Sequence, residues 1–213
     1  MSLAPCLLLS MPQLVDPNFA RSVILLCEHQ PEGAFGLIVN RPSDVEAAAA
    51  VHLDPPLDQP NDLPLLLGGP VERQRGWILT SQRPEGVESR TLGAGLYLSA
   101  SPVLLRRALS ARPLPKRTHV LAGYAGWGPG QLDEELAQSA WLIMPVELDL
   151  IFEIPSAAAW EMARLTLAGM RLEKRSASRA SAHWRRLQVT PSVRRSSRVE
   201  SGKFSRTVNA SLF

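Results

Sequence analysis

Cysteine is scarce in this chain: Cys6 and Cys27 are the only two among 213 residues. Disulfide frameworks need several closely spaced cysteines, and structural zinc generally needs four ligands in close pairs. The histidines do not supply a metal motif either, since His52, His119 and His183 are isolated in the sequence. The sequence therefore predicts no disulfide, no metal and no cofactor, and it predicts two small buried thiols.

Long apolar runs are also missing, because no stretch approaches the roughly 20 apolar residues that span a bilayer. The first six residues lack the basic region and the long apolar segment of a secretory signal. Apolar residues still make up 45% of the chain, which is enough to bury the core of one domain. We expect a cytoplasmic protein without membrane contact.

Basic residues are scarce in most of the chain and concentrated at its end. Residues 1–170 hold 12 Lys and Arg against 18 Asp and Glu, a net charge of −6, whereas residues 171–213 hold 11 against 2, a net charge of +9. This contrast predicts a domain over residues 1–169 and a basic, Ser/Arg-rich tail over residues 170–213 that is disordered or an atypical terminus. Association of the tail with nucleic acid, through arginine contacts to phosphates, is one alternative function.

Seven short apolar runs bounded by turn residues predict strands. Most runs are apolar at every position, which is typical of strands covered on both faces. The segment from Cys27 to Val39 has the length of a hairpin, and Gly33 supplies the positive φ of its turn. The predicted strands are Leu7–Leu9, Val23–Cys27, Leu37–Val39, Trp77–Leu79, Leu96–Leu98, His119–Ala122 and Trp141–Met144.

Helix signals lie between and after these strands, which indicates an α+β fold. Residues 43–46 (Ser-Asp-Val-Glu) have the spacing of a capping box and predict a helix that continues through Ala50. Ser101-Pro102 is an N-cap followed by proline at the first helical position. A third helix is expected after Ser156, with Gly169 as its end. Residues 52–64 are rich in Pro and Asp and predict a surface loop.

The most distinctive stretch runs from Gly123 to Glu135 and combines four glycines with Tyr124, Trp127 and Pro129. It follows an apolar run and precedes a helix, so we interpret it as a strand-to-helix loop, with Pro129 in the first helical turn. A phosphate-binding loop is disfavoured, because residues 133–135 (Asp-Glu-Glu) would repel an anion. Trp127 is interpreted as an anchor in the core or, as the alternative, as an interface residue.

Cys27-Glu28-His29 places a thiol, a carboxylate and an imidazole at the end of a strand. Strand alternation predicts Cys27 and His29 on one face and Glu28 on the other. The two would still stand roughly 7 Å apart, beyond hydrogen-bond reach. A buried Cys27 is therefore favoured, and a thiol enzyme or redox switch at Cys27 is the alternative.

Four stretches of the chain follow one another in a recognisable order, within residues 7–29, 33–42, 67–79 and 123–142. Through these stretches the sequence resembles the YqgE/AlgH family of bacterial proteins over residues 7 to about 168. The resemblance implies an α+β fold with a bent, partly barrel-like mixed β-sheet flanked by helices, and it implies no established chemistry. Some members of that family carry a transcriptional-regulator label. From Met170 onward the sequence departs from the family pattern, as a shifted reading frame or a replaced terminus would produce.

These observations predict a binding or regulatory protein, not an enzyme, with a protein partner. Irregular polar and aromatic segments between well-specified strands are typical of binding surfaces. Within one of these segments, Asp16 is expected to pair with Arg21. The candidate surface consists of Met11, Pro12, Asp16, Arg21, Asn40, Arg41, Tyr124, Trp127 and Gln131.

Overall fold

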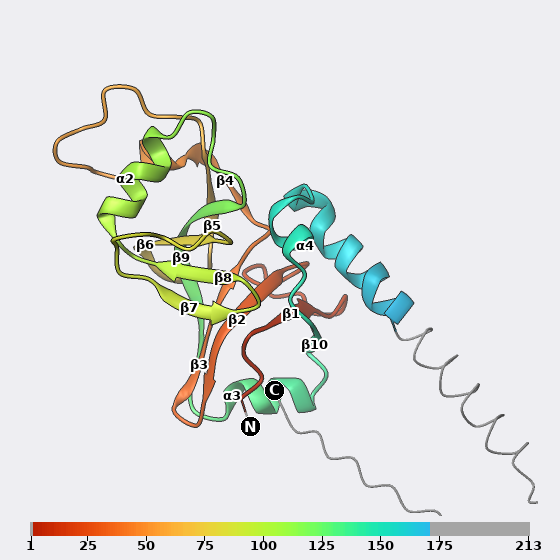
Figure 1. The fold of residues 1–213 in the computed structure, drawn as a ribbon. Helices are drawn as coiled ribbons and strands as arrows, with labels where there is room; N and C mark the ends of the chain where they lie inside the picture. The colour runs from red at the N-terminus through yellow and green to blue at the C-terminus, as the bar shows by residue number, and fades with distance from the viewer. Residues whose placement is uncertain (1, 171–213) are drawn as a thin grey trace, which may run out of the picture. The chain divides into compact units, whose positions relative to one another are not determined.

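The computed structural model describes residues 2–170, which form ten strands in one mixed, mostly antiparallel sheet with helices packed around it (Figure 1). The strands follow the order β10-β1-β2-β3-β9-β6-β8-β7, and β4 and β5 join through the pairing of β5 with β9. The α+β prediction is confirmed. The strands are β1 (Cys6–Ser10), β2 (Val23–Gln30), β3 (Gly33–Ile38), β4 (Pro42–Glu46), β5 (Pro64–Leu67), β6 (Val71–Thr80), β7 (Arg90–Gly93), β8 (Leu96–Ser99), β9 (Thr118–Trp127) and β10 (Trp141–Met144).

Four labelled helices and one further helix pack on this sheet. Figure 1 shows α2 and α3 at opposite ends of it. The expected N-cap of α2 is confirmed, since the Ser101 hydroxyl accepts a hydrogen bond from the Leu104 amide. The helices are α1 (Ala47–Ala50), α2 (Pro102–Ser110), α3 (Gln131–Ala137), α4 (Leu148–Phe152) and a helix over residues 156–170.

The strands with continuous apolar runs are covered on both faces, as their composition predicted. In β1, Leu7 and Leu9 belong to one buried cluster and Leu8 to another. In β2, Leu25 belongs to the first cluster and Ile24 to the second. α4 and the helix over residues 156–170 cover the first face, and α3 covers the second. This double burial makes the central strands a rigid support for the residues on their surfaces.

Strand β9 holds the sheet together because it has three partners. It pairs with β6 along one edge, and along the other it pairs in parallel with β5 and antiparallel with β3. The change of partner occurs around Gly123, which has a φ of +73°. Regular strand pairing continues as far as Trp127, so the expected loop over 123–127 is wrong, and only residues 128–130 connect β9 to α3. Pro129 therefore precedes the helix rather than lying in its first turn.

Two expected helix boundaries are also wrong. Residues 43–46 lie in β4 instead of forming a capping box, and the Ser43 hydroxyl accepts a hydrogen bond from the Val45 amide. Pairing of β4 with β5 outweighs the local helix signal there. The helix over residues 156–170 continues through Gly169, which was expected to end it. Among residues 2–170, no helix is both long and apolar enough to cross a membrane.

Candidate functional site

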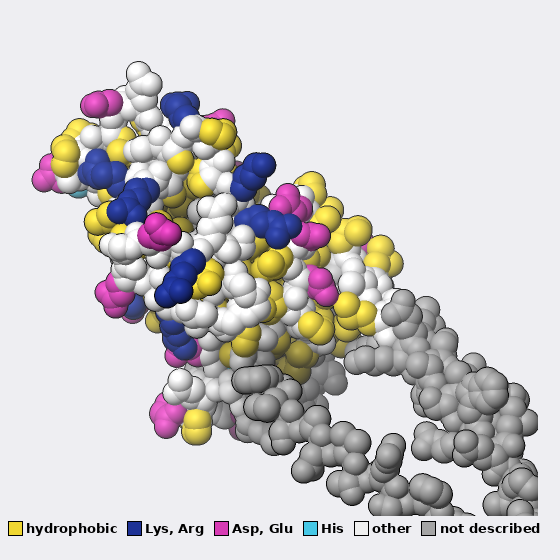
Figure 2. Space-filling view, in the orientation of Figure 1, with side chains coloured by type: hydrophobic (Ala, Val, Ile, Leu, Met, Phe, Trp, Pro, Cys, Tyr) yellow, Lys and Arg dark blue, Asp and Glu magenta, His cyan; other side chains and the backbone are white. Residues whose placement is uncertain are grey.

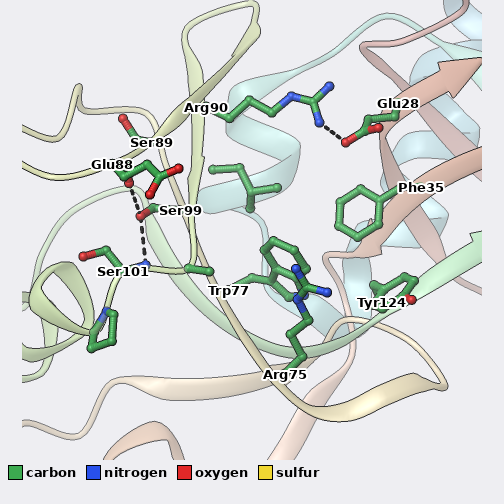
Figure 3. Close-up of a pocket in the computed structure, with 13 residues that line it drawn as sticks. Glu28, Phe35, Arg75, Trp77, Glu88, Ser89, Arg90, Ser99, Ser101 and Tyr124 are labelled. Atoms are coloured by element: carbon green, nitrogen blue, oxygen red, sulfur yellow. Dashed lines mark hydrogen bonds and ion pairs between the residues drawn. The ribbon is translucent and has the colours of Figure 1, made fainter.

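A cleft of about 730 Å³ opens on the sheet between the aromatic side chains of three strands and the N-terminal end of α2 (Figure 3). Its walls come from β2, β3, β6, β8 and β9 and from the segment that leads into β7. Clefts of this size accommodate a small molecule or a few residues of a peptide. The lining residues are Glu28, Phe35, Arg75, Trp77, Glu88, Ser89, Arg90, Leu98, Ser99, Ala100, Ser101, Pro102 and Tyr124.

One wall of the cleft is aromatic. Phe35 lies in β3, Tyr124 in β9 and Trp77 in β6, which are consecutive strands in the sheet. The Phe35 ring centroid is 5.1 Å from those of both Trp77 and Tyr124, and the Trp77 and Tyr124 rings meet edge to face at 6.5 Å. Gly126 leaves room for this arrangement, since a Cβ there would approach the Tyr124 ring to 3.2 Å. We call Phe35, Trp77 and Tyr124 the aromatic wall.

Arg75 lies over the aromatic wall because β6 departs from regular pairing beside it. Val71 pairs with Tyr124 and Gly76 with Ala122, so residues 72–75 of β6 stand opposite a single residue of β9. The Arg75 guanidinium lies 4.6 Å from the Trp77 ring centroid and 3.2 Å from a Glu72 carboxylate oxygen. Its side chain remains 52% exposed. A guanidinium stacked on an indole is a cation–π contact, which is weak when solvent reaches the cation.

The indole Nε1–H of Trp77 is buried and has no hydrogen-bond partner within residues 2–170. The contrast with the other tryptophans of this part of the chain is clear. Trp127 and Trp141 donate to the Glu135 carboxylate, and Trp160 donates to the carbonyl of Ser10. Buried donors are almost always paired, so the unpaired indole of Trp77 is unusual within residues 2–170.

The other side of the cleft is polar. Arg90 forms an ion pair with Glu28, and both side chains are partly exposed (Figure 3). The Ser99 hydroxyl donates to the carbonyl of Glu88 at 2.6 Å and accepts from the Ser101 amide at 3.1 Å. Around the cleft, basic and acidic side chains are interspersed over the face that carries α2, β7 and β8 (Figure 2). The serines therefore shape this wall, while Arg90 and Arg75 hold its accessible donors.

Part of the predicted binding surface comes together elsewhere, at the loop between β1 and β2. Arg41 donates to the carbonyls of Pro17, Asn18 and Ala20, at 3.3, 2.5 and 3.3 Å. Burial lowers the pKa of the Arg41 guanidinium, and nearby Asp16 partly offsets this. Arg41 thus pins the loop to the sheet with its forked donors.

Neighbouring residues of that loop are held in the same way. Asn40 accepts from the Val23 amide at 2.8 Å and donates to the carbonyl of Arg21 at 3.0 Å. Asp16 accepts from the amide of Asn18 at 2.8 Å, and the Arg21 guanidinium lies 5.9 Å from the Trp160 ring centroid. The expected Asp16–Arg21 pair is therefore wrong, because each side chain has another neighbour.

The remaining residues of the predicted surface lie in other places. Met11 is half-buried and its amide donates to the carbonyl of Ala140, while Pro12 is exposed. Tyr124 belongs to the aromatic wall. Trp127 is 6% exposed and buried in the second core cluster, as the anchor interpretation predicted, and Gln131 donates to Glu135. The nine residues thus do not form one continuous surface.

A β-bulge at Cys27 corrects the predicted side-chain directions. Leu26 pairs with Gly36 and Glu28 with Phe35, so Cys27 is the extra residue. Cys27 joins the first core cluster and Glu28 enters the cleft, whereas the His29 imidazole lies 3.3 Å from the Asp133 carboxylate of α3. Alternation fails here because the bulge turns two successive side chains to the same side.

Cys27 is expected to resist alkylation at neutral pH in the folded protein. The side chain is 4% exposed, and burial raises the pKa of its thiol to about 12, an effect that nearby Arg90 only partly offsets. Almost no thiolate exists at pH 7, and the thiolate is the nucleophile. Mass spectrometry after iodoacetamide treatment measures this, with the same protein in denaturant as the positive control. Rapid labelling of native Cys27 would restore the thiol alternative.

Sequence reasoning missed most of the cleft. Trp77 was assigned only to a strand, and Phe35, Arg75 and Arg90 were given no role. The available signal was the group Arg75-Gly76-Trp77, in which a basic side chain precedes an indole by two positions. Within residues 2–170, no three His, Cys, Asp or Glu side chains converge as a metal centre requires.

Comparisons with known proteins agree with this architecture. Residues 7–172 match the family model described as AlgH-like, DUF179. A UPF0301 protein of Thioalkalivibrio sulfidiphilus is 38% identical over 162 residues, covering 75% of this chain and 87% of the relative. A UPF0301 protein of Legionella pneumophila is 36% identical over 184 residues, covering 85% of this chain and 97% of the relative.

Solved structures agree as well. The solution structure of the AlgH protein from Pseudomonas aeruginosa superposes with a TM-score of 0.63 at 34% identity, covering 78% of this chain and 87% of that one. The crystal structure of DIP2367 from Corynebacterium diphtheriae shares the fold, with a TM-score of 0.55 at 24% identity, covering 74% and 83%. The chain therefore belongs to the AlgH-like, UPF0301 family.

Proposed function

We propose that this protein is a non-enzymatic binding protein of a regulatory kind, and that the cleft is its recognition site. The observation that carries the proposal is the unpaired, buried indole N–H of Trp77 within an aromatic wall flanked by Arg75 and Arg90. Aromatic and arginine side chains dominate the energetics of recognition sites. A ligand or a segment of a partner that fills the cleft would bury the aromatic wall and bind the guanidinium groups of Arg75 and Arg90.

The hollow beside Arg21, Asn40, Arg41 and Trp160, of about 450 Å³, is a weaker candidate. Arg41 and Asn40 already bind backbone groups of the protein itself. A ligand would have to compete with those bonds. Association of nucleic acid with the basic tail concerns residues 171–213, which lie outside the described residues.

The double variant Arg75→Ala/Arg90→Ala is expected to lose the molecule that the wild type retains from a cell extract. Both side chains are about half exposed, so their removal leaves the core intact. The measurement is mass spectrometry of proteins and small molecules retained by the immobilised chain. Arg73→Ala/Arg83→Ala is the matched control, since it removes the same charge outside the cleft lining.

Loss of the retained molecule in Arg75→Ala/Arg90→Ala, the cleft variant, and not in the control variant supports the proposal. Identical retention by all three proteins would show that the cleft is not the recognition site. Retention of nothing by the wild type would argue against a binding role in that extract.

A further inference from the structure

We infer that the ligand of the cleft is a planar aromatic group that carries an anionic oxygen group, a carboxylate or a phosphate. The inference rests on the proposed function and specifies the chemistry of the same site. Its basis is the balance of donors and acceptors around the aromatic wall, together with the positions of the two guanidinium groups.

The accessible donors of this cleft are the guanidinium groups of Arg75 and Arg90, both about half exposed. The Trp77 indole N–H has no partner, and a guanidinium carries five N–H donors and no acceptor. The Ser99 hydroxyl and the Ser101 amide are already bonded to the protein. A complementary ligand must therefore bring acceptors, and anionic oxygens bind guanidinium groups most strongly.

The present partners of the two arginines are replaceable. Arg75 pairs with Glu72 and Arg90 with Glu28, and the four side chains are between 33% and 52% exposed. Ion pairs this exposed contribute little to stability, because water screens the attraction. A ligand anion can bind one of these guanidinium groups at small cost, because each carries five N–H donors and its present ion pair is weak.

The aromatic wall favours a flat group between the two arginines. In Figure 3, Arg90 lies above Phe35, and the Arg75 guanidinium lies against Trp77, level with Tyr124. The stacked Arg75 guanidinium already shows that the Trp77 face accepts a planar group. In Figure 3 the side chain of Glu88 lies beside Ser99, away from the aromatic wall, so an anion is favoured near the arginines and disfavoured near Glu88.

The test uses the indole N–H signals of the ¹⁵N-labelled full-length protein in nuclear magnetic resonance spectra. Trp77 is identified by its loss in Trp77→Phe. Trp127, Trp141 and Trp160 are internal controls, because their indole N–H groups are already bonded. The probes are phenylacetate and phenyl phosphate, compared with phenylacetamide, phenethylamine, acetate and inorganic phosphate.

Phenylacetate, phenyl phosphate or both are expected to shift the Trp77 signal saturably, while the three control signals stay in place. The stronger of the two identifies a carboxylate or a phosphate as the preferred group. In Arg75→Ala/Arg90→Ala the dissociation constant should rise about ten-fold or more, because a charge-assisted bond is lost. Arg73→Ala/Arg83→Ala should match the wild type.

The inference fails if phenylacetamide or phenethylamine shifts the Trp77 indole signal at a concentration equal to or lower than that of the aromatic anions. It also fails if acetate or inorganic phosphate shifts this signal as well as the aromatic anions do, or if no probe shifts it. A failure of this inference can be distinguished from a failure of the proposed function. Loss of extract binding in the cleft variant without a probe response would keep the recognition site and overturn only the ligand class. A probe response with unchanged extract binding would overturn the proposed function.

Discussion

Replacement of Glu135 by alanine is expected to lower the free energy of unfolding by about 3 kcal/mol, because it leaves two buried indole donors without an acceptor. One carboxylate oxygen of Glu135 accepts from Trp127 at 2.9 Å and from Trp141 at 2.7 Å, and the other accepts from Gln131 at 2.8 Å. Trp127 and Trp141 are 6% and 5% exposed, so water cannot readily replace the carboxylate. Urea denaturation followed by circular dichroism measures the loss.

The carboxylate also joins separate parts of the fold. Trp127 ends β9, Trp141 begins β10, and their rings meet edge to face with centroids 6.0 Å apart. Phe19, from the loop between β1 and β2, packs on Trp141 at 5.8 Å. Glu135 therefore fixes the end of β9 and the start of β10 to α3, and Phe19 brings the loop between β1 and β2 to the same cluster.

Glu134→Ala is the matched control, since Glu134 lies next to Glu135 in α3 with an exposed side chain. Its effect should stay within about 0.5 kcal/mol. The loss of stability in Glu135→Gln should fall between those of Glu134→Ala and Glu135→Ala, because its amide oxygen can still accept from an indole but carries no charge. Equal stability of the Glu134 and Glu135 variants would contradict the assigned role.

The seven strands that were predicted, β1, β2, β3, β6, β8, β9 and β10, were found because the prediction depended on local composition, whereas β4, β5 and β7 were not predicted. The apolar runs of β1 and β2 have no polar position, and a strand of that kind must be covered on both faces. The hairpin from Val23 to Ile38 also follows from local signals, with Gly33 at its turn. The family resemblance supplied the bending of the sheet, which the runs alone do not specify.

The cleft could not be predicted in the same way, since it depends on strand order. Phe35, Trp77 and Tyr124 are far apart in sequence and meet only because β9 lies between β3 and β6. Two irregularities also change which side chains face the cleft. One is the bulge at Cys27, and the other is the break in regular pairing of β6 with β9 over residues 72–75. Strand alternation fails at both places.

Local patterns also missed the structural role of Glu135. The sequence shows three consecutive carboxylates at residues 133–135, which were interpreted together as groups that would repel an anion. The start of α3 at Gln131 decides which of them faces the indoles. That start depends on Gly130, which has a φ of +72° immediately before the helix.

Gly69→Ala is expected to have a still larger effect. The free energy of unfolding should fall by at least about 4 kcal/mol, or the protein should fail to fold, because the backbone of β9 lies directly against this residue. A Cβ at Gly69 would lie closer than 3.0 Å to three backbone atoms of Tyr124 and Ala125, and Gly69 has a φ of +157°. Gly123 is its counterpart, since a Cβ there would lie 2.5 Å from the carbonyl oxygen of Gly69. Backbone atoms cannot move aside as a flexible side chain can, so the sheet would have to open at this contact.

Gly76→Ala, in β6, is the control, because a Cβ at Gly76 meets no atom within 4 Å. Its stability should stay close to that of the wild type, as judged by urea denaturation and by the yield of folded protein. If Gly69→Ala were as stable as Gly76→Ala, close backbone packing would not explain the glycines. If the expected difference is found, Gly69 and Gly123 are needed for the close approach of β9 to the segment before β6, and not for binding a ligand. Tyr124, which follows Gly123 in β9, is placed in the aromatic wall by that close approach, so the same backbone contact that limits substitution also shapes the cleft.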